Sequence, residues 1–193
     1  MSPVLVAGIG NIFRGDDGFG VAAAQRMAGR PWPAGVTVKD FGIRSLDLTY
    51  TLLDGYAAVI LLDTAQRGEP PGTVYMIEPE ASAIAETQPE DLLLSPHELD
   101  PVGVLRLAKA LGGQCRRVVL VACEPASFGD DEWGAMELTP PVAAAIDTAA
   151  ALVEQVVHQL LTEESSPWIP VTQPTHSETV PSRPTERPSA AGG

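Results

Sequence analysis

Three carboxylates and one histidine in this sequence have the chemistry and the placement for a functional site. Asp16 and Asp17 lie side by side in a glycine-rich stretch after an apolar run, Asp63 directly follows another apolar run, and His97 precedes an amphipathic segment. Two carboxylates and one imidazole leave coordination positions open and suit a divalent first-row metal. Asp17, Asp63 and His97 are therefore a candidate metal-binding set. Their ligand types do not distinguish nickel from zinc or iron.

Each of these residues also has a plain structural interpretation. A carboxylate such as Asp16 at a helix start can accept backbone N–H bonds and interact with the helix dipole. Asp63, at the end of a strand, can form a turn, and a lone histidine is more often structural than functional. The other histidines give no further candidate, because His158 falls in the last predicted helix and His176 in the C-terminal segment. At this level both interpretations stay open.

Two predicted strands would bring the carboxylates together. Apolar runs at about residues 3–7 and 57–62 are typical of strands in a parallel sheet that is covered on both faces. In such sheets, ligands bind at the carboxyl ends of the strands. Asn11, Asp16 and Asp17 follow the first of these strands and Asp63 follows the other, so we expect them to converge at one edge.

The remaining hydrophobic patterns alternate between strand and helix. This alternation predicts an α/β fold, a three-layer sandwich with a mostly parallel central sheet and helices on both faces. We expect the domain to span residues 1–162 and the Pro/Ser/Thr-rich residues 163–193 to form a disordered tail. Further strands are predicted at about 36–41, 73–77 (compatible with an antiparallel edge) and 117–122, and helices at about 17–28, 46–53 and 140–161. Another helix is predicted to follow Ser95-Pro96-His97, to carry Val104, Leu105, Ala108 and Leu111, and to end at Gly112-Gly113.

Composition excludes several classes of function. The 193 residues carry a net charge of −13, from 12 basic and 25 acidic side chains, which argues against a nucleic-acid partner. No apolar run approaches the roughly 20 residues that a membrane span needs, and the N-terminus shows no signal peptide. We therefore expect a cytoplasmic protein. Cys115 and Cys123 fit neither a disulfide framework nor a metal knuckle, and are interpreted as free structural thiols.

A dinucleotide site is excluded although Gly8-Ile9-Gly10 follows a strand. The third glycine of the fingerprint is absent, because Ile12 and Phe13 occupy that region. The acidic pair would also face the pyrophosphate at the helix N-terminus. No nucleotide cofactor is expected.

Several motifs together resemble one enzyme family over about residues 4–161. Gly8-Ile9-Gly10-Asn11, Asp16-Asp17-Gly18-Phe19-Gly20, Leu61-Leu62-Asp63 and Ser95-Pro96-His97-Glu98-Leu99 resemble motifs of the nickel-iron hydrogenase maturation endopeptidases. The resemblance implies an aspartic-type, nickel-dependent hydrolase. It would remove a C-terminal extension from a hydrogenase large-subunit precursor after nickel insertion, using the substrate's nickel for recognition.

The resemblance also implies roles for individual residues. The three nickel-binding positions of the family fall on Asp17, Asp63 and His97, and Asp16 is a second candidate for activating water. The first ligand is often glutamate in the family, and Asp17 is one methylene shorter. Gly42 matches a family glycine near the cleft. The expected partner is the nickel-loaded precursor, bound by a monomer that contacts neither nucleic acid nor membrane.

Two other functions compete with this interpretation. A nickel-dependent adaptor of hydrogenase maturation would bind the precursor without cleaving it. The opening Gly8-Ile9-Gly10-Asn11 also resembles peptidyl-tRNA hydrolase, but that family needs a basic surface and an earlier histidine than His97. An unrelated zinc peptidase is disfavoured because the sequence contains no His-Glu-x-x-His motif.

Overall fold

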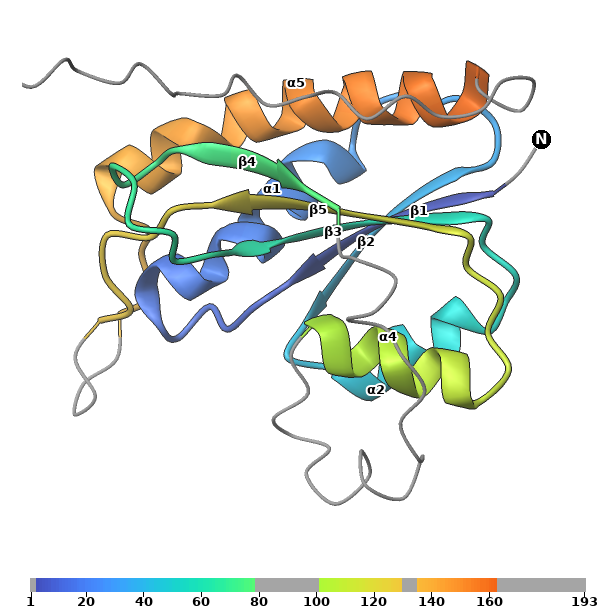
Figure 1. The fold of residues 1–193 in the computed structure, drawn as a ribbon. Coiled ribbons are helices and arrows are strands. Elements are labelled where there is room, and N and C mark those ends of the chain that lie inside the picture. Colours follow the sequence, from blue (N-terminus) through green and yellow to red (C-terminus); the bar gives the residue numbers. More distant parts are fainter. Residues whose placement is uncertain (1–2, 79–100, 130–134, 163–193) are drawn as a thin grey trace, which may run out of the picture.

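A five-stranded sheet forms the middle layer of the molecule (Figure 1). The computed structural model describes residues 3–78, 101–129 and 135–162. Strand order is β2-β1-β3-β5-β4. The elements are β1 (Val4–Ile9), η1 (Gly15–Gly18), α1 (Phe19–Ala28), β2 (Val36–Gly42), α2 (Ser45–Leu52), β3 (Ala58–Thr64), β4 (Val74–Ile77), α4 (Pro101–Ala110), β5 (Arg117–Cys123) and α5 (Pro140–Thr162).

The predicted mostly parallel sheet is confirmed. β1 pairs in parallel with β2 and β3, and β3 pairs in parallel with β5. Only β4 is antiparallel, and it forms the edge beside β5, as its short connection from β3 suggested. The carboxyl ends of β1, β2, β3 and β5 therefore open onto the same edge of the sheet.

Alternating side chains of each central strand build two separate hydrophobic layers. In β1, Val4 and Val6 pack with α1 and α5, whereas Leu5 and Ala7 pack with α2 and α4. Figure 1 shows these two helix pairs on opposite faces of the sheet. Successive side chains of the apolar strand point to opposite faces, so the sheet is covered by helices on both sides. This three-layer sandwich confirms the predicted fold class.

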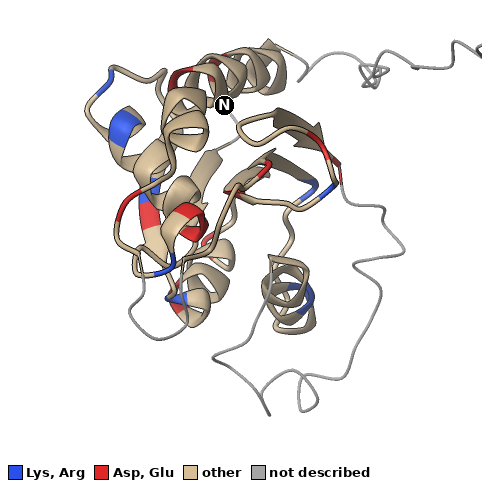
Figure 2. Ribbon diagram, turned by 90° about the vertical axis from the view of Figure 1, so that its left-hand side faces the viewer, with Lys and Arg blue, Asp and Glu red and all other residues tan. Residues whose placement is uncertain are grey.

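Helix α1 lies unusually close to the sheet. A Cβ atom at Gly20 would lie 2.0 Å from the carbonyl oxygen of Leu62 and 2.3 Å from that of Ile9. Only a residue without a side chain fits between α1 and strands β1 and β3. On the outer side of the same layer, Arg26 pairs with Asp147 of α5 at 3.2 Å. Figure 2 shows where the acidic and basic residues lie along the ribbon.

The structure corrects two predicted boundaries. The helix expected from Asp17 instead begins as the 3-10 turn η1 and becomes α-helical at Phe19. Strand β3 continues to Thr64, so Asp63 is its penultimate residue rather than the residue after it.

Both cysteines are free, as predicted. His97 and the C-terminal residues 163–193 lie outside the described residues. No helix within the described ranges is long and apolar enough to cross a membrane.

Candidate active site at the carboxyl edge of the sheet

Asp17 and Asp63 both lie close to Gly10, the residue after β1. Gly10 has φ +124°, and a Cβ on it would lie 1.9 Å from the carbonyl oxygen of Asp17 and 3.9 Å from Oδ1 of Asp63. The backbone N–H of Asn11 donates to Oδ2 of Asp17 at 3.0 Å. This bond folds the loop back, so that η1 lies against the end of β1. The structure thus brings Asp17 and Asp63 to one edge, as the sequence predicts.

Asp63 is positioned by the centre of the sheet. Its strand, β3, lies between β1 and β5, and Asp63 is paired in register with Ala122 of β5. Oδ1 of Asp63 accepts a hydrogen bond from the N–H of Thr64 at 2.7 Å. Both Asp63 and Asp17 keep partial exposure to solvent. Their carboxylates are therefore accessible to a ligand.

Asp16, unlike Asp17 and Asp63, is completely buried, and its carboxylate is bonded within the protein. Its Oδ2 accepts hydrogen bonds from the N–H groups of Ala126 at 2.8 Å and Ser127 at 3.0 Å, and from the Thr139 hydroxyl at 2.9 Å. Its Oδ1 accepts the N–H of Thr139 at 2.7 Å. The carboxylate thus joins three segments: the loop after β1, the loop after β5 and the residue before α5.

These contacts revise the predicted role of Asp16 as a cap of its own helix. Neither η1 nor α1 has a side-chain cap hydrogen bond. Burial alone raises the pKa of Asp16, but hydrogen bonds from the backbone of Thr139, Ser127 and Ala126 and from the Thr139 hydroxyl outweigh it and hold the pKa below its ordinary value. A buried, fully bonded carboxylate of low pKa is suited to positioning a loop. Its catalytic role stays a prediction, which this geometry does not favour.

The two accessible carboxylates fit part of a metal-binding set. Oδ2 of Asp17 accepts the N–H of Asn11, the residue after Gly10, and Oδ1 of Asp63 lies 3.9 Å from the position of a Cβ on Gly10. Carboxylate oxygens bind divalent first-row ions. Within residues 3–78, 101–129 and 135–162, no group of three His, Cys, Asp or Glu side chains could hold a metal ion. The third predicted ligand, His97, lies outside those ranges. Two of the three predicted ligands are therefore placed together.

A fourth carboxylate at this edge was missed by the sequence analysis. Glu124 directly follows β5, is 5% exposed, and accepts hydrogen bonds from the N–H groups of Arg67 at 2.8 Å and Gly68 at 3.1 Å. The Tyr75 hydroxyl also donates to it. The bond from Tyr75, and then those from the backbone, hold the pKa of Glu124 below its ordinary value despite burial. Glu124 fixes the loop after Asp63. The rule that selected Asp63, an acid at the end of an apolar strand, would have found it.

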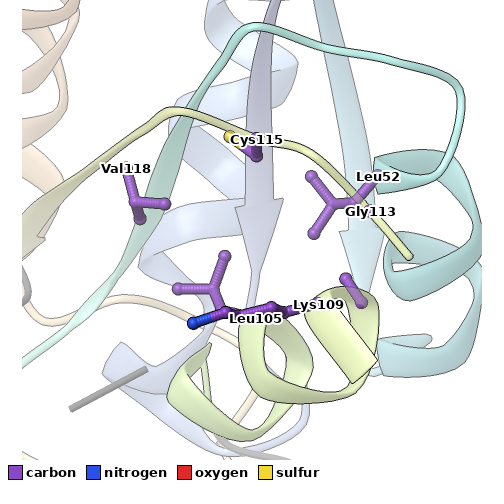
Figure 3. A pocket seen from close by; sticks show the side chains of 7 residues that line it. Leu52, Leu105, Lys109, Gly113, Cys115 and Val118 are labelled. Carbon is purple, nitrogen blue, oxygen red and sulfur yellow. The ribbon is translucent and has the colours of Figure 1, made fainter. Parts of the chain in front are cut away.

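A cavity lies at each end of the sheet. One, of about 300 Å³, extends from Gly10 along the ends of β1 and β2 and includes Gly42, whose carbonyl accepts the N–H of Gly10 at 3.1 Å. The other, of about 130 Å³, lies among α2, α4 and the start of β5 (Figure 3). Leu52, Leu105, Lys109 and Cys115 line it, and its described lining contains no carboxylate or histidine. Of these two, the cavity of about 300 Å³ is the one next to the candidate site, because Gly10 lines it.

Comparisons with known proteins agree on one family. The family model for hydrogenase maturation protease matches residues 21–156. The hydrogenase expression/formation protein HupD of Rhodobacter capsulatus is 35% identical over 150 residues, covering 77% of this chain and 68% of the relative. A solved structure of a hydrogenase 2 maturation peptidase from a Thaumarchaeota archaeon is 32% identical, with a TM-score of 0.60. The match covers 81% of this chain and 98% of the peptidase chain. The solution structure of an endopeptidase from Escherichia coli is 25% identical, with a TM-score of 0.66. This match covers 82% of this chain and 93% of the endopeptidase chain.

Proposed function

This chain belongs to the hydrogenase maturation proteases, and from that premise we propose that it removes the C-terminal extension of a nickel-iron hydrogenase large-subunit precursor after nickel insertion. The observation that supports this assignment best is that Asp17 and Asp63, both partly exposed, lie close to Gly10 at the carboxyl edge of the sheet. We further propose that the protein acts as a cytoplasmic monomer. Its nickel arrives with the substrate.

In this proposal, recognition depends on the ligand set of the enzyme. Asp17, Asp63 and His97 would contact nickel that the precursor already holds, since carboxylates and imidazole are ligand types for such ions. A precursor without nickel would lack this contact, so cleavage would follow insertion. Recognition would thereby test whether the metal centre of the substrate is complete.

The proposal also divides the work among the carboxylates. Asp17 and Asp63 retain exposure and can reach a water molecule or the substrate, whereas all four hydrogen bonds to Asp16 come from within the protein. An aspartic-type mechanism would use one of the exposed pair as the general base. Asp16 would hold the loop that carries Asp17.

Cleavage of the precursor should depend on each of the three candidate ligands. We expect Asp17→Asn, Asp63→Asn and His97→Ala each to reduce cleavage of a nickel-loaded precursor by at least about 100-fold, because each removes a ligand or a base. The mass of the large subunit after incubation measures cleavage, and circular dichroism checks that each variant folds. Activity should also fall in acid as His97 becomes protonated, because only neutral imidazole binds metal.

The same assay carries its controls. Asp54→Asn changes an exposed carboxylate in the turn after α2 and should leave processing unchanged. Nickel-free precursor should remain uncut. Full processing by the Asp63 and His97 variants would refute the proposed site, whereas a stable complex of wild-type protein with uncut, nickel-loaded precursor would favour the adaptor function.

A further inference from the structure

Exposed apolar side chains gather at the cavity beside Gly10. Seven large hydrophobic residues are exposed among the described residues, and three of them line this one groove: Ile12, Phe13 and Ile43, with 43%, 57% and 70% of their surface exposed. Two come from the loop after β1 and the third from the residue after β2. Exposed apolar side chains that cluster mark a surface for binding a partner.

The backbone that presents these side chains is held in place. Phe13 donates its N–H to Oδ1 of Asn11 at 2.9 Å, and its carbonyl accepts the N–H of Ala135 at 3.1 Å. The carbonyl of Ile43 accepts the N–H of Ser45 at 3.0 Å. The groove is therefore a formed feature, and binding a ligand there would not first require ordering these loops.

The charged groups around the groove are largely engaged with the protein itself. Arg44 donates from Nε to the carbonyl of Phe41 at 2.9 Å and from Nη2 to the carbonyl of Asp40 at 2.6 Å. The Asp40 carboxylate accepts a hydrogen bond from Gln25 at 3.0 Å. These internal bonds leave the apolar side chains as the main binding feature. The volume, about 300 Å³, is at the lower limit for ligand pockets and suits one or two large side chains.

We propose that this groove binds an extended apolar stretch of the precursor polypeptide immediately next to the cleaved bond. The proposal rests on the proposed function, because a protease must hold its substrate chain beside the bond that it cuts. Gly10 links the two regions, since it lines the groove, and a Cβ on it would lie 1.9 Å from the Asp17 carbonyl oxygen and 3.9 Å from Oδ1 of Asp63. A chain bound at Asp17 and Asp63 would extend past Gly10 into the groove, where Ile12, Phe13 and Ile43 would select apolar side chains.

Ile43 offers the sharpest test because it is the most exposed of the three. We expect Ile43→Asp to weaken binding of the nickel-loaded large-subunit precursor by about tenfold or more, the size expected when burial of one large aliphatic side chain is lost. Ile43→Leu should bind within about twofold of wild type. In steady-state cleavage, Ile43→Asp should raise KM with little change in kcat.

The matched control is Leu111→Asp. Leu111 is 44% exposed and directly follows α4, away from the carboxyl edge of the sheet, so this variant should bind and cleave like wild type. Equal binding by Ile43→Asp and wild type would overturn the groove proposal. Weakening by Leu111→Asp as large as that by Ile43→Asp would overturn it too, since the effect would then not belong to the groove.

A cross-linking experiment identifies the occupant. The photoreactive residue p-benzoylphenylalanine, placed at position 43, should cross-link to the precursor within a few residues of the cleaved bond. A cross-link to a second copy of this chain, or to a distant part of the precursor, would overturn the proposal.

Failure of the groove proposal can be told apart from failure of the proposed function. Precursor that wild-type protein binds but never shortens contradicts the protease function, while the Ile43 comparison still decides the groove. Cleavage by wild type and by Ile43→Asp with equal KM contradicts the groove alone. Absence of any binding to the precursor by wild type contradicts both.

Discussion

Two neighbouring carboxylates in this protein have opposite surroundings. Asp16 is completely buried and accepts four hydrogen bonds, whereas Asp17 accepts the N–H of Asn11 and keeps partial exposure. They lie in a 3-10 turn, where successive side chains point about 120° apart because there are three residues per turn. One acid can therefore face the interior while the next faces the candidate site.

This arrangement gives a prediction for Asp16→Asn. The amide offers one oxygen where the carboxylate offers two, so at least one of the N–H or O–H donors from Ala126, Ser127 and Thr139 would lose its acceptor. We expect the free energy of unfolding to fall by about 2 kcal/mol near pH 7. Urea denaturation measures the loss, and Asp54→Asn, at an exposed position, should change the midpoint little.

The pH dependence of the same variant separates charge from packing. The pKa of folded Asp16 is below its ordinary value of 3.8, so its stabilisation is complete above that value and is lost as the pH falls through the folded pKa. The difference in stability between wild type and Asp16→Asn should therefore shrink below about pH 4. A difference that stays constant down to pH 3 would show that the charge of Asp16 contributes nothing.

At the scale of the elements, helix α1 is held close to the sheet at Gly20. It begins at the end of η1 and packs against β1 and β3 through Gly20, so the depth of this helix and the position of Asp17 are coupled. A helix held further from the sheet would move the loop that carries the candidate ligand. Gly20 thus serves the packing of α1 on the sheet.

Replacing this glycine tests the coupling. Gly20→Ala would place a Cβ 2.0 Å from the carbonyl oxygen of Leu62, and backbone must move to relieve the clash. We expect a loss of at least about 2 kcal/mol in the free energy of unfolding, measured by urea denaturation. Gly29→Ala is the matched control, because a Cβ there meets nothing within 4 Å and should change stability by less than about 0.5 kcal/mol. Equal stability of the two variants would contradict the packing role of Gly20.

Local pattern predicted most elements because each strand and helix carries its own hydrophobic period. The apolar runs of β1 and β3, the antiparallel edge at β4 and the long amphipathic α5 are all confirmed. The missed start of α1 has a local cause: the sequence pattern cannot distinguish a 3-10 turn from the first turn of an α-helix.

Over the whole molecule, sequence pattern failed where a side chain finds its partner far along the chain. Asp16 bonds to Ala126, 110 residues away, and Glu124 bonds to Arg67, 57 residues away. Strand ends predict that acids gather at one edge, since parallel topology requires it. Topology does not predict which acid turns inward to hold loops and which stays accessible, because that depends on the donors that the folded chain supplies.

Net charge is the whole-molecule property that separates the family assignment from the competing tRNA enzyme. A charge of −13 repels a phosphate backbone, and lowering the salt concentration strengthens that repulsion. We expect no association with bulk tRNA at about 20 mM salt and protein concentrations up to about 100 µM, a range that reveals ordinary non-specific binding. Fluorescence anisotropy of labelled tRNA measures it, with a basic protein of similar mass as the positive control. Binding that weakens as salt is added would restore the nucleic-acid alternative, because it would reveal a basic surface that the net charge conceals.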